Sequence, residues 1–198
     1  YLGGYGPTDP PRMSNNQNPG ISNTLLSESI AVPFLSFLII EPDPVVKNAI
    51  PTHIEKLIKE RKFADATKAI DAALVKSPRN VQLRFVKARL QIELRDFESA
   101  KKTWVEITQQ FPELPEPYNN LAALAANQGK WIEARDYLEL ALKLRPDYVT
   151  AQGNLADVYL RLSETNYLSA SKLQPNQREY GLRAKAIKEI LNPTAKPS

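Results

Sequence analysis

The sequence predicts an all-α protein in which pairs of helices stack into a solenoid, and two observations support this prediction. The first is an internal period of 34 residues beyond residue 46. Four sets of residues recur at that spacing: Pro78, Pro112 and Pro146; Ala66, Ala100 and Ala134; Ala88, Ala122 and Ala156; and the aromatic residues Phe63, Phe97 and Trp131. The second is that apolar residues between these markers lie three or four positions apart, which is the spacing of one helix face. A fixed period of about 20–50 residues is the signature of a repeat architecture.

The period and the residue types resemble the tetratricopeptide repeat, a helix–turn–helix unit of 34 residues. The resemblance implies repeats at residues 47–80, 81–114 and 115–148, with an irregular fourth unit from Val149. The two alanine sets would sit where the first and second helices of a repeat, helix A and helix B, approach closely. The aromatic residues would begin helix B, and the prolines would end it because proline donates no backbone hydrogen bond.

The agreement with the repeat pattern differs along the chain. It is best in the third repeat, at Tyr118, Leu121, Ala122, Gly129, Trp131, Ala134, Leu138, Ala141 and Pro146. The second repeat departs from it, with Arg84 and Lys87 where an aromatic residue and a leucine are usual. The first repeat has Pro51 inside its expected helix A, so we expect that helix to begin there, where proline suits the first turn.

The fourth unit lacks the usual break between two helices. From residue 154 to residue 173 there is no glycine or proline, so we expect one long helix that is broken at Pro175. A helix with a kink near Ser163 is the alternative. A last helix over about residues 177–191 has an apolar face and a face that carries Lys185, Lys188 and Glu189. A polar outer face suits the end of a solenoid, which has no further neighbour. Residues 192–198 are expected to form a disordered tail.

The first 46 residues form a separate, extended arm by composition. They hold four of the seven glycines and seven of the sixteen prolines, and their net charge is −3 against +7 for residues 47–198. Such a segment is not expected to fold alone. Residues 30–40 interrupt it with an apolar run, IAVPFLSFLII. The run fits a buried strand, a hydrophobic anchor or a signal-peptide remnant. It also fits an internal cap on the first repeat, or an assembly segment that docks through Phe34, Phe37 and Ile39.

Composition argues against several classes of function. Cysteine is absent and His53 is the only histidine, so we expect no catalytic cysteine, no metal site and no cofactor. Nucleotide-binding and hydrolase motifs rich in glycine are missing as well. The basic residues alternate with acidic ones and lack interleaved aromatics, which disfavours nucleic acid as a partner. No apolar run reaches the ~18–20 residues that a membrane-spanning helix needs.

A non-enzymatic scaffold is therefore the favoured function, and the resemblance places its binding surface in the concave groove that the A helices line. The candidate groove residues for a peptide or protein partner are Phe85, Arg89, Asn119, Asn120, Asn127, Asn154, Asp157 and Arg161. Asn120 and Asn154 share one repeat position, and asparagine both donates to and accepts from a peptide backbone. Alternatively, these two residues only bond the turns between helices. A structural subunit docked through the arm is the other function that the sequence leaves open.

Residues 51 and 55 disfavour one known activity of the family. The carboxylate-clamp members use basic and amide residues there, whereas this chain has Pro51 and Glu55. More narrowly, the run FPELPEPYNNL at residues 111–121 and the fused fourth unit resemble small exported tetratricopeptide proteins of Gram-negative bacteria. This similarity covers about residues 52–191 and implies a periplasmic or otherwise extracytoplasmic location, with a cytoplasmic one as the alternative.

Overall fold

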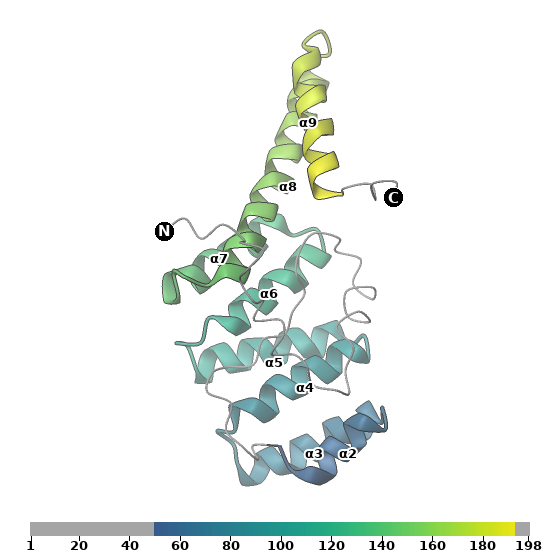
Figure 1. Cartoon of the computed structure of the whole chain (residues 1–198), viewed down its shortest axis with the longest axis vertical. Helices are drawn as coiled ribbons and strands as arrows, with labels where there is room; N and C mark the ends of the chain where they lie inside the picture. Colours follow the sequence, from purple (N-terminus) through teal and green to yellow (C-terminus); the bar gives the residue numbers. More distant parts are fainter. Residues whose placement is uncertain (1–49, 193–198) are drawn as a thin grey trace, which may run out of the picture.

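The computed structural model describes residues 50–192, and this part of the chain is a stack of antiparallel helix pairs (Figure 1). The helices are α2 (Thr52–Lys59), α3 (Phe63–Lys76), α4 (Val81–Glu93), α5 (Phe97–Gln110), α6 (Glu116–Asn127), α7 (Trp131–Leu144), α8 (Val149–Leu173) and α9 (Arg178–Leu191). The all-α solenoid prediction is confirmed. The arm with Phe34, Phe37 and Ile39, and the tail after Asn192, lie outside the described residues.

The second helix of each repeat begins and ends where the sequence predicts. Helices α3, α5 and α7 begin at the three aromatic residues, and each has 14 residues. Each ends two residues before a repeated proline. The following turn is also repeated, because the amides of Asn80, Leu114 and Tyr148 donate to carbonyls three residues earlier, at 3.0, 3.1 and 3.1 Å.

The turn between helix A and helix B is built the same way in three repeats. The second residue after helix A has a left-handed backbone, with φ of 57° at Arg61, 58° at Arg95 and 72° at Gly129. The next amide then donates to a carbonyl five residues earlier, for example from Lys130 to Ala125 at 2.9 Å. This is the Schellman end of a helix, in which glycine is usual because it carries no Cβ. The two arginines take the same conformation at a steric cost.

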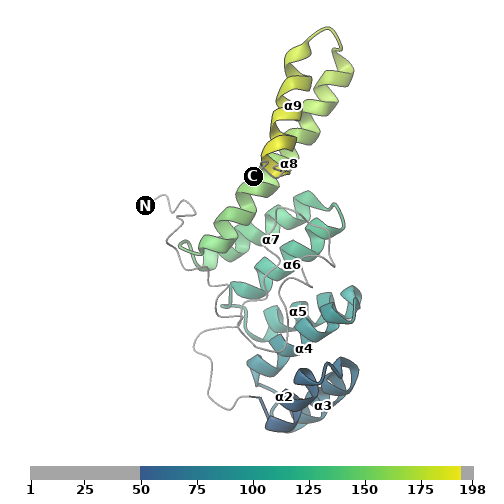
Figure 2. The ribbon, with the colours of Figure 1, turned by 45° about the vertical axis from the view of Figure 1, so that its right-hand side comes forward.

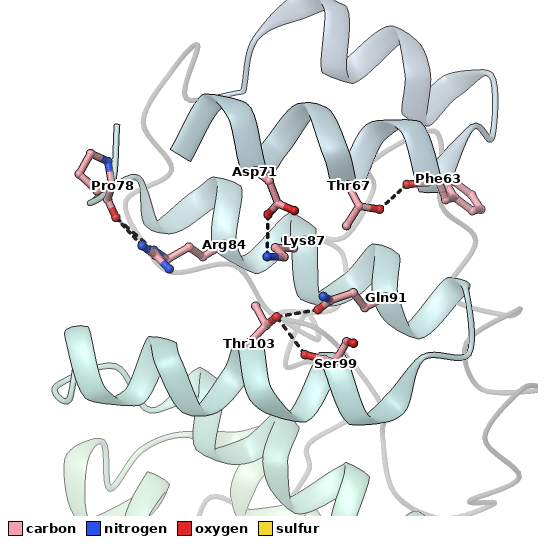
Figure 3. Close-up of polar contacts among 9 residues, drawn as sticks. All are labelled: Phe63, Thr67, Asp71, Pro78, Arg84, Lys87, Gln91, Ser99 and Thr103. Atoms are coloured by element: carbon pink, nitrogen blue, oxygen red, sulfur yellow. Dashed lines mark hydrogen bonds and ion pairs between the residues drawn. The ribbon is translucent and has the colours of Figure 1, made fainter. Parts of the chain in front are cut away.

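The unusual residues of the second repeat have polar partners in the first repeat (Figure 3). The guanidinium of Arg84 donates through Nε and Nη2 to the carbonyl of Pro78, at 3.2 and 2.7 Å. The ammonium of Lys87, on α4, pairs with the carboxylate of Asp71 on α3 at 2.6 Å. On the other side of α4, Thr103 donates to Gln91 at 2.7 Å. Polar contacts between neighbouring helices thus replace the aromatic residue and the leucine.

The fourth unit is one uninterrupted helix followed by an antiparallel return, as the sequence predicts. Helix α8 has 25 residues, and α9 packs beside its distal part (Figures 1 and 2). The rings of Tyr167 and Tyr180 stack with centroids 6.3 Å apart, and a Cβ added to Gly181 would lie 3.4 Å from Ser171 Oγ. This hairpin projects beyond the stacked pairs in both views.

Two expectations for the fourth unit need correction. Ala156 is exposed, whereas its equivalents Ala88 and Ala122 are 0 and 1% exposed. The reason is that α8 continues past the place where helix B would fold back, so Ala156 has no helix B to contact. The outer face of α9 is not uniformly polar either, because Leu182 and Ile190 are exposed beside Lys185 and Lys188.

None of the helices within residues 50–192 combines the length and the apolar character that a membrane span requires.

Candidate functional site: the groove of the A helices

Helices α4, α6 and α8 are the A helices of successive units, and their groove positions carry polar side chains that are buried. Asn119 is 0% exposed, Asn120 and Arg89 are each 2% exposed, and Asn154 is 4% exposed. Ala123 and Ala126 lie beside them on α6 and are equally buried. Buried polar groups cost free energy unless they are hydrogen-bonded, so each of these side chains requires a partner.

The asparagines form a connection between two A helices. The Nδ2 group of Asn154, on α8, donates to Oδ1 of Asn119, on α6, at 2.9 Å. This bond joins helix to helix, so Asn154 does not simply cap a turn. The Nδ2 groups of Asn119 and Asn120 have no acceptor within residues 50–192, although both atoms are buried. Two buried amide donors on α6 therefore have no hydrogen-bond partner in the described part of the chain.

One end of the groove is fixed by a buried ion pair. The Glu116 side chain, at the start of α6, is 1% exposed, and its Oε1 lies 2.7 Å from Nη1 of Arg145. The guanidinium of Arg145 also lies over the ring of Tyr148, 5.3 Å from its centroid. The pair joins the start of α6 to the turn before α8. Loss of either charge would leave the other one poorly solvated.

Two acidic residues near the groove have raised pKa values. Burial raises the pKa of Glu93, at the end of α4, although the charges of Arg61 and Arg89 oppose this shift. Burial alone raises the pKa of Asp157 to about 6. Arg161 lies one turn further along α8, but its guanidinium pairs with Glu164 at 2.8 Å and lies over the Trp131 ring. Asp157 is therefore a carboxyl group that titrates in a partly apolar environment.

Two family models of the tetratricopeptide repeat match the chain, at residues 55–115 and at residues 115–148. The chain belongs to the tetratricopeptide repeat family. The first match begins inside α2 and ends at the start of the third predicted repeat, and the second match coincides with that third repeat, residues 115–148. Tetratricopeptide repeats generally mediate protein–protein interactions, so protein partners are implied here as well. No curated protein matches the sequence.

The structure brings two of the predicted groove residues, Asn119 and Asn154, into contact, and it corrects the placement of a third. Phe85 is fully buried, and its ring meets that of Trp104 edge to face at 5.0 Å. It belongs to the core between α4 and α5, where its ring contacts that of Trp104. Asn127 is half-buried at the end of α6, and the Arg161 side chain is engaged with Glu164 and Trp131.

The sequence places Glu116 at a groove position but does not predict its ion pair with Arg145. They are 29 residues apart, a separation that corresponds to no helix or repeat spacing, and the other repeats of this tetratricopeptide protein have Gln82 or Thr150 at the position of Glu116. Only the fold, which places the turn before α8 next to the start of α6, shows that their charges are paired.

Proposed function

We propose that the protein is a non-enzymatic scaffold that binds an extended peptide or protein segment in the groove of α4, α6 and α8. The observation that supports this proposal is the pair of buried amide donors at Asn119 and Asn120, which have no acceptor within residues 50–192. Membership of an interaction family makes a protein partner the first candidate for supplying those acceptors.

An extended peptide has the chemistry that these donors need. Each of its residues carries a carbonyl oxygen, and in an extended chain successive residues advance by about 3.3 Å. Carbonyls of one backbone can therefore meet neighbouring side-chain amides on a single helix. Each bond would contribute about 1 kcal/mol, and leaving a buried donor unpaired costs about 1–3 kcal/mol.

The small side chains beside the asparagines favour the same kind of ligand. Ala123 and Ala126 follow Asn119 and Asn120 on α6, one and two turns along the helix. Alanine leaves room for a backbone to approach closely, and because Ala123 and Ala126 are 2 and 3% exposed, a ligand must first displace the neighbours that cover them. The bond that Asn154 donates fixes the orientation of the Asn119 side-chain amide. It leaves the Nδ2 hydrogens of Asn119 for a ligand. These residues thus combine preorganised donors with an apolar surface.

The test is to select peptides of about twelve residues from a random display library on the full chain, and then to measure affinities by calorimetry. We expect Asn119→Ala combined with Asn120→Ala to weaken binding roughly thirtyfold, which is the loss of two hydrogen bonds of about 1 kcal/mol each. Asn166→Ala is the matched control, because Asn166 is an exposed asparagine elsewhere on α8. Equal affinities of the double variant and the control, with circular dichroism unchanged, would contradict the proposal.

A further inference from the structure

Three apolar residues lie in one exposed row along α9. Leu182 and Ile190 are 66 and 63% exposed, and Ala186 between them is exposed as well. Because the three residues are four positions apart, they form a single i, i+4, i+8 row on the helix surface, which we call the α9 row. The buried residues of α9 lie on a different face, which packs on α8. The α9 row is therefore not part of the contact that holds the hairpin together.

The position of the hairpin leaves room for a second molecule along this row. The hairpin of α8 and α9 projects beyond the stacked helix pairs in both views (Figures 1 and 2). Within residues 50–192, α8 is the helix that packs most closely on α9. If two hairpins lie side by side in opposite directions, their two stacks lie at opposite ends of the pair and do not collide.

The α9 row is complementary to a second copy of itself. A two-fold axis through Ala186 sets two α9 helices antiparallel, and it brings Leu182 of each copy level with Ile190 of the other. The small alanine at the crossing point lets the helices approach closely, while the larger side chains on either side fill the space beside it. This is how rows of residues four apart pack between helices. Most soluble homo-oligomers use such two-fold contacts, in which one surface serves both partners.

The charges beside the α9 row favour the same arrangement. Lys185 and Glu189 lie on one side of the row, and neither forms an ion pair within residues 50–192. The two-fold axis makes this side face its counterpart, so Lys185 of one copy lies about 3 Å along the helix from the level of Glu189 of the other. The four side chains then form a cluster of two positive and two negative charges. Because both signs occur here, the surface matches a copy of itself better than a partner of one charge sign.

We propose that the α9 row is a self-association surface through which two copies of this chain pair their hairpins antiparallel. The contact involves one face of a 14-residue helix, about 21 Å long. It is smaller than the ~1,200–2,000 Å² that stable complexes bury, so we expect a weak dimer with a dissociation constant of about 10–100 µM. The proposal does not depend on the function of the groove, since α9 takes no part in it.

Sedimentation equilibrium of the full chain tests the proposal, at concentrations from about 5 to 500 µM that bracket the expected constant. Leu182→Glu should weaken the dimer at least about tenfold, because the contact would then bury a charge. Val75→Glu is the matched control, since Val75 is an apolar residue on α3 that is 82% exposed, and it should leave the dimer unchanged. Circular dichroism checks that both variants fold. A chain that stays monomeric throughout, or equal weakening by both variants, would overturn the proposal.

Reversal of the two charges tests the antiparallel register. Lys185→Glu alone makes all four charges of the cluster negative, and Glu189→Lys alone makes them all positive. Each variant should weaken the dimer about fivefold, because like charges replace the attractive pairs. The double variant restores two charges of each sign and should return to within about threefold of the unaltered chain. Losses in the double variant as large as the two single losses combined, or no loss in any variant, would overturn the proposed pairing.

A single cysteine locates the two-fold axis. The sequence has no cysteine, so Ala186→Cys introduces one thiol at the proposed crossing point. Under mild oxidation we expect rapid formation of a disulfide-linked dimer, because a disulfide needs two Cα atoms within about 4.4–6.8 Å. Leu173→Cys is the control, since Leu173 is 83% exposed at the end of α8, away from the axis, and it should not cross-link at a comparable rate. Faster cross-linking at residue 173 than at residue 186 would show that the copies meet at the tips of the hairpins, which overturns pairing through the α9 row.

Discussion

Helices α6 and α8 hold the same place in successive units, yet their surroundings differ. Ten of the twelve residues of α6 are buried, whereas six of the twenty-five residues of α8 are buried. Helix α6 lies between two other helix pairs, and α8 continues past the stack as one arm of a hairpin with α9. The polar side chains of the groove therefore belong to the enclosed part of the molecule, and the hairpin is an extension with one packed face.

A single turn accounts for this difference. In the first three repeats, helix A ends near a residue with positive φ, the last of which is Gly129. The equivalent position in the fourth unit is Ser163, and α8 passes through it without interruption. Helix B is consequently displaced along the chain and becomes α9. The side chains that would have met helix B, such as Ala156, stay in solvent.

The largest effect should come from placing the same bulky residue at two equivalent positions. Ala122 is 1% exposed where α6 meets its neighbours, so Ala122→Trp should overpack the core and destabilise the protein by about 1–3 kcal/mol or more. Ala156→Trp changes the equivalent residue of α8, which is exposed, and should alter stability by no more than about 0.5 kcal/mol. Urea unfolding followed by circular dichroism measures both. Similar losses in the two variants would mean that α8 has a helix partner at Ala156.

The enclosed region is also the part that the sequence predicts best. Four residue sets at one period define the helix pairs, because each set performs the same packing role in every repeat. Helix B begins within one residue of the aromatic marker in three repeats. The left-handed turns at Arg61 and Arg95 were not predicted, since arginine carries no signal for positive φ. Only Gly129 marks that turn in the sequence.

The candidate site is less predictable, for a physical reason. Repeat position assigns a side chain to the groove, but it does not determine which neighbour the side chain contacts. Phe85 shares its position with Asn119, yet it packs on Trp104 because an aromatic ring gains more from the core than from a polar groove. The bond from Asn154 to Asn119 and the pair of Glu116 with Arg145 join helices 29 to 35 residues apart. Such contacts depend on the rotation between units, which a period does not reveal.

Asp157 lies where the enclosed region meets the hairpin, and it should give a smaller, pH-dependent effect. Burial raises its pKa from 3.8 to about 6, so between those values the folded state binds a proton that the unfolded state does not. Stability should therefore fall as pH rises through this range. Asp157→Asn should stabilise the protein by about 1–2 kcal/mol at pH 8, less than the full shift would give because the side chain is only partly buried. Below about pH 4 the two proteins should be equally stable.

Glu60 provides a control of opposite sign for that experiment. Its hydrogen bond with Lys62 and the charge of Lys62 lower the pKa of this carboxylate, which lies in the turn between α2 and α3. Glu60→Gln should therefore lose a small stabilisation at neutral pH, and the loss should disappear in acid. Urea titrations at pH 3.5 and pH 8 measure both variants. An Asp157→Asn effect that is the same at both pH values would show that burial of charge is not its cause.

The smallest effects should come from one substitution made in each region, glycine to alanine, and their signs should be opposite. Gly129 has a φ of 72° in the turn after α6, and a Cβ there would meet nothing within 4 Å. The cost of Gly129→Ala is therefore purely that of the left-handed backbone, about 1 kcal/mol. Gly181 lies inside α9, and a Cβ there would make an ordinary contact with Ser171 Oγ at 3.4 Å. Gly181→Ala should stabilise the hairpin by about 0.5–1 kcal/mol, since alanine favours helix more than glycine does.

The two glycine substitutions need different measurements. Global unfolding in urea reports the effect of Gly129→Ala. Amide hydrogen exchange along α9 reports the effect of Gly181→Ala, because exchange measures local opening of a helix separately from global unfolding. A stabilising Gly129→Ala would show that the turn does not need positive φ. A destabilising Gly181→Ala would show that α9 packs too closely on α8 to accept a methyl group.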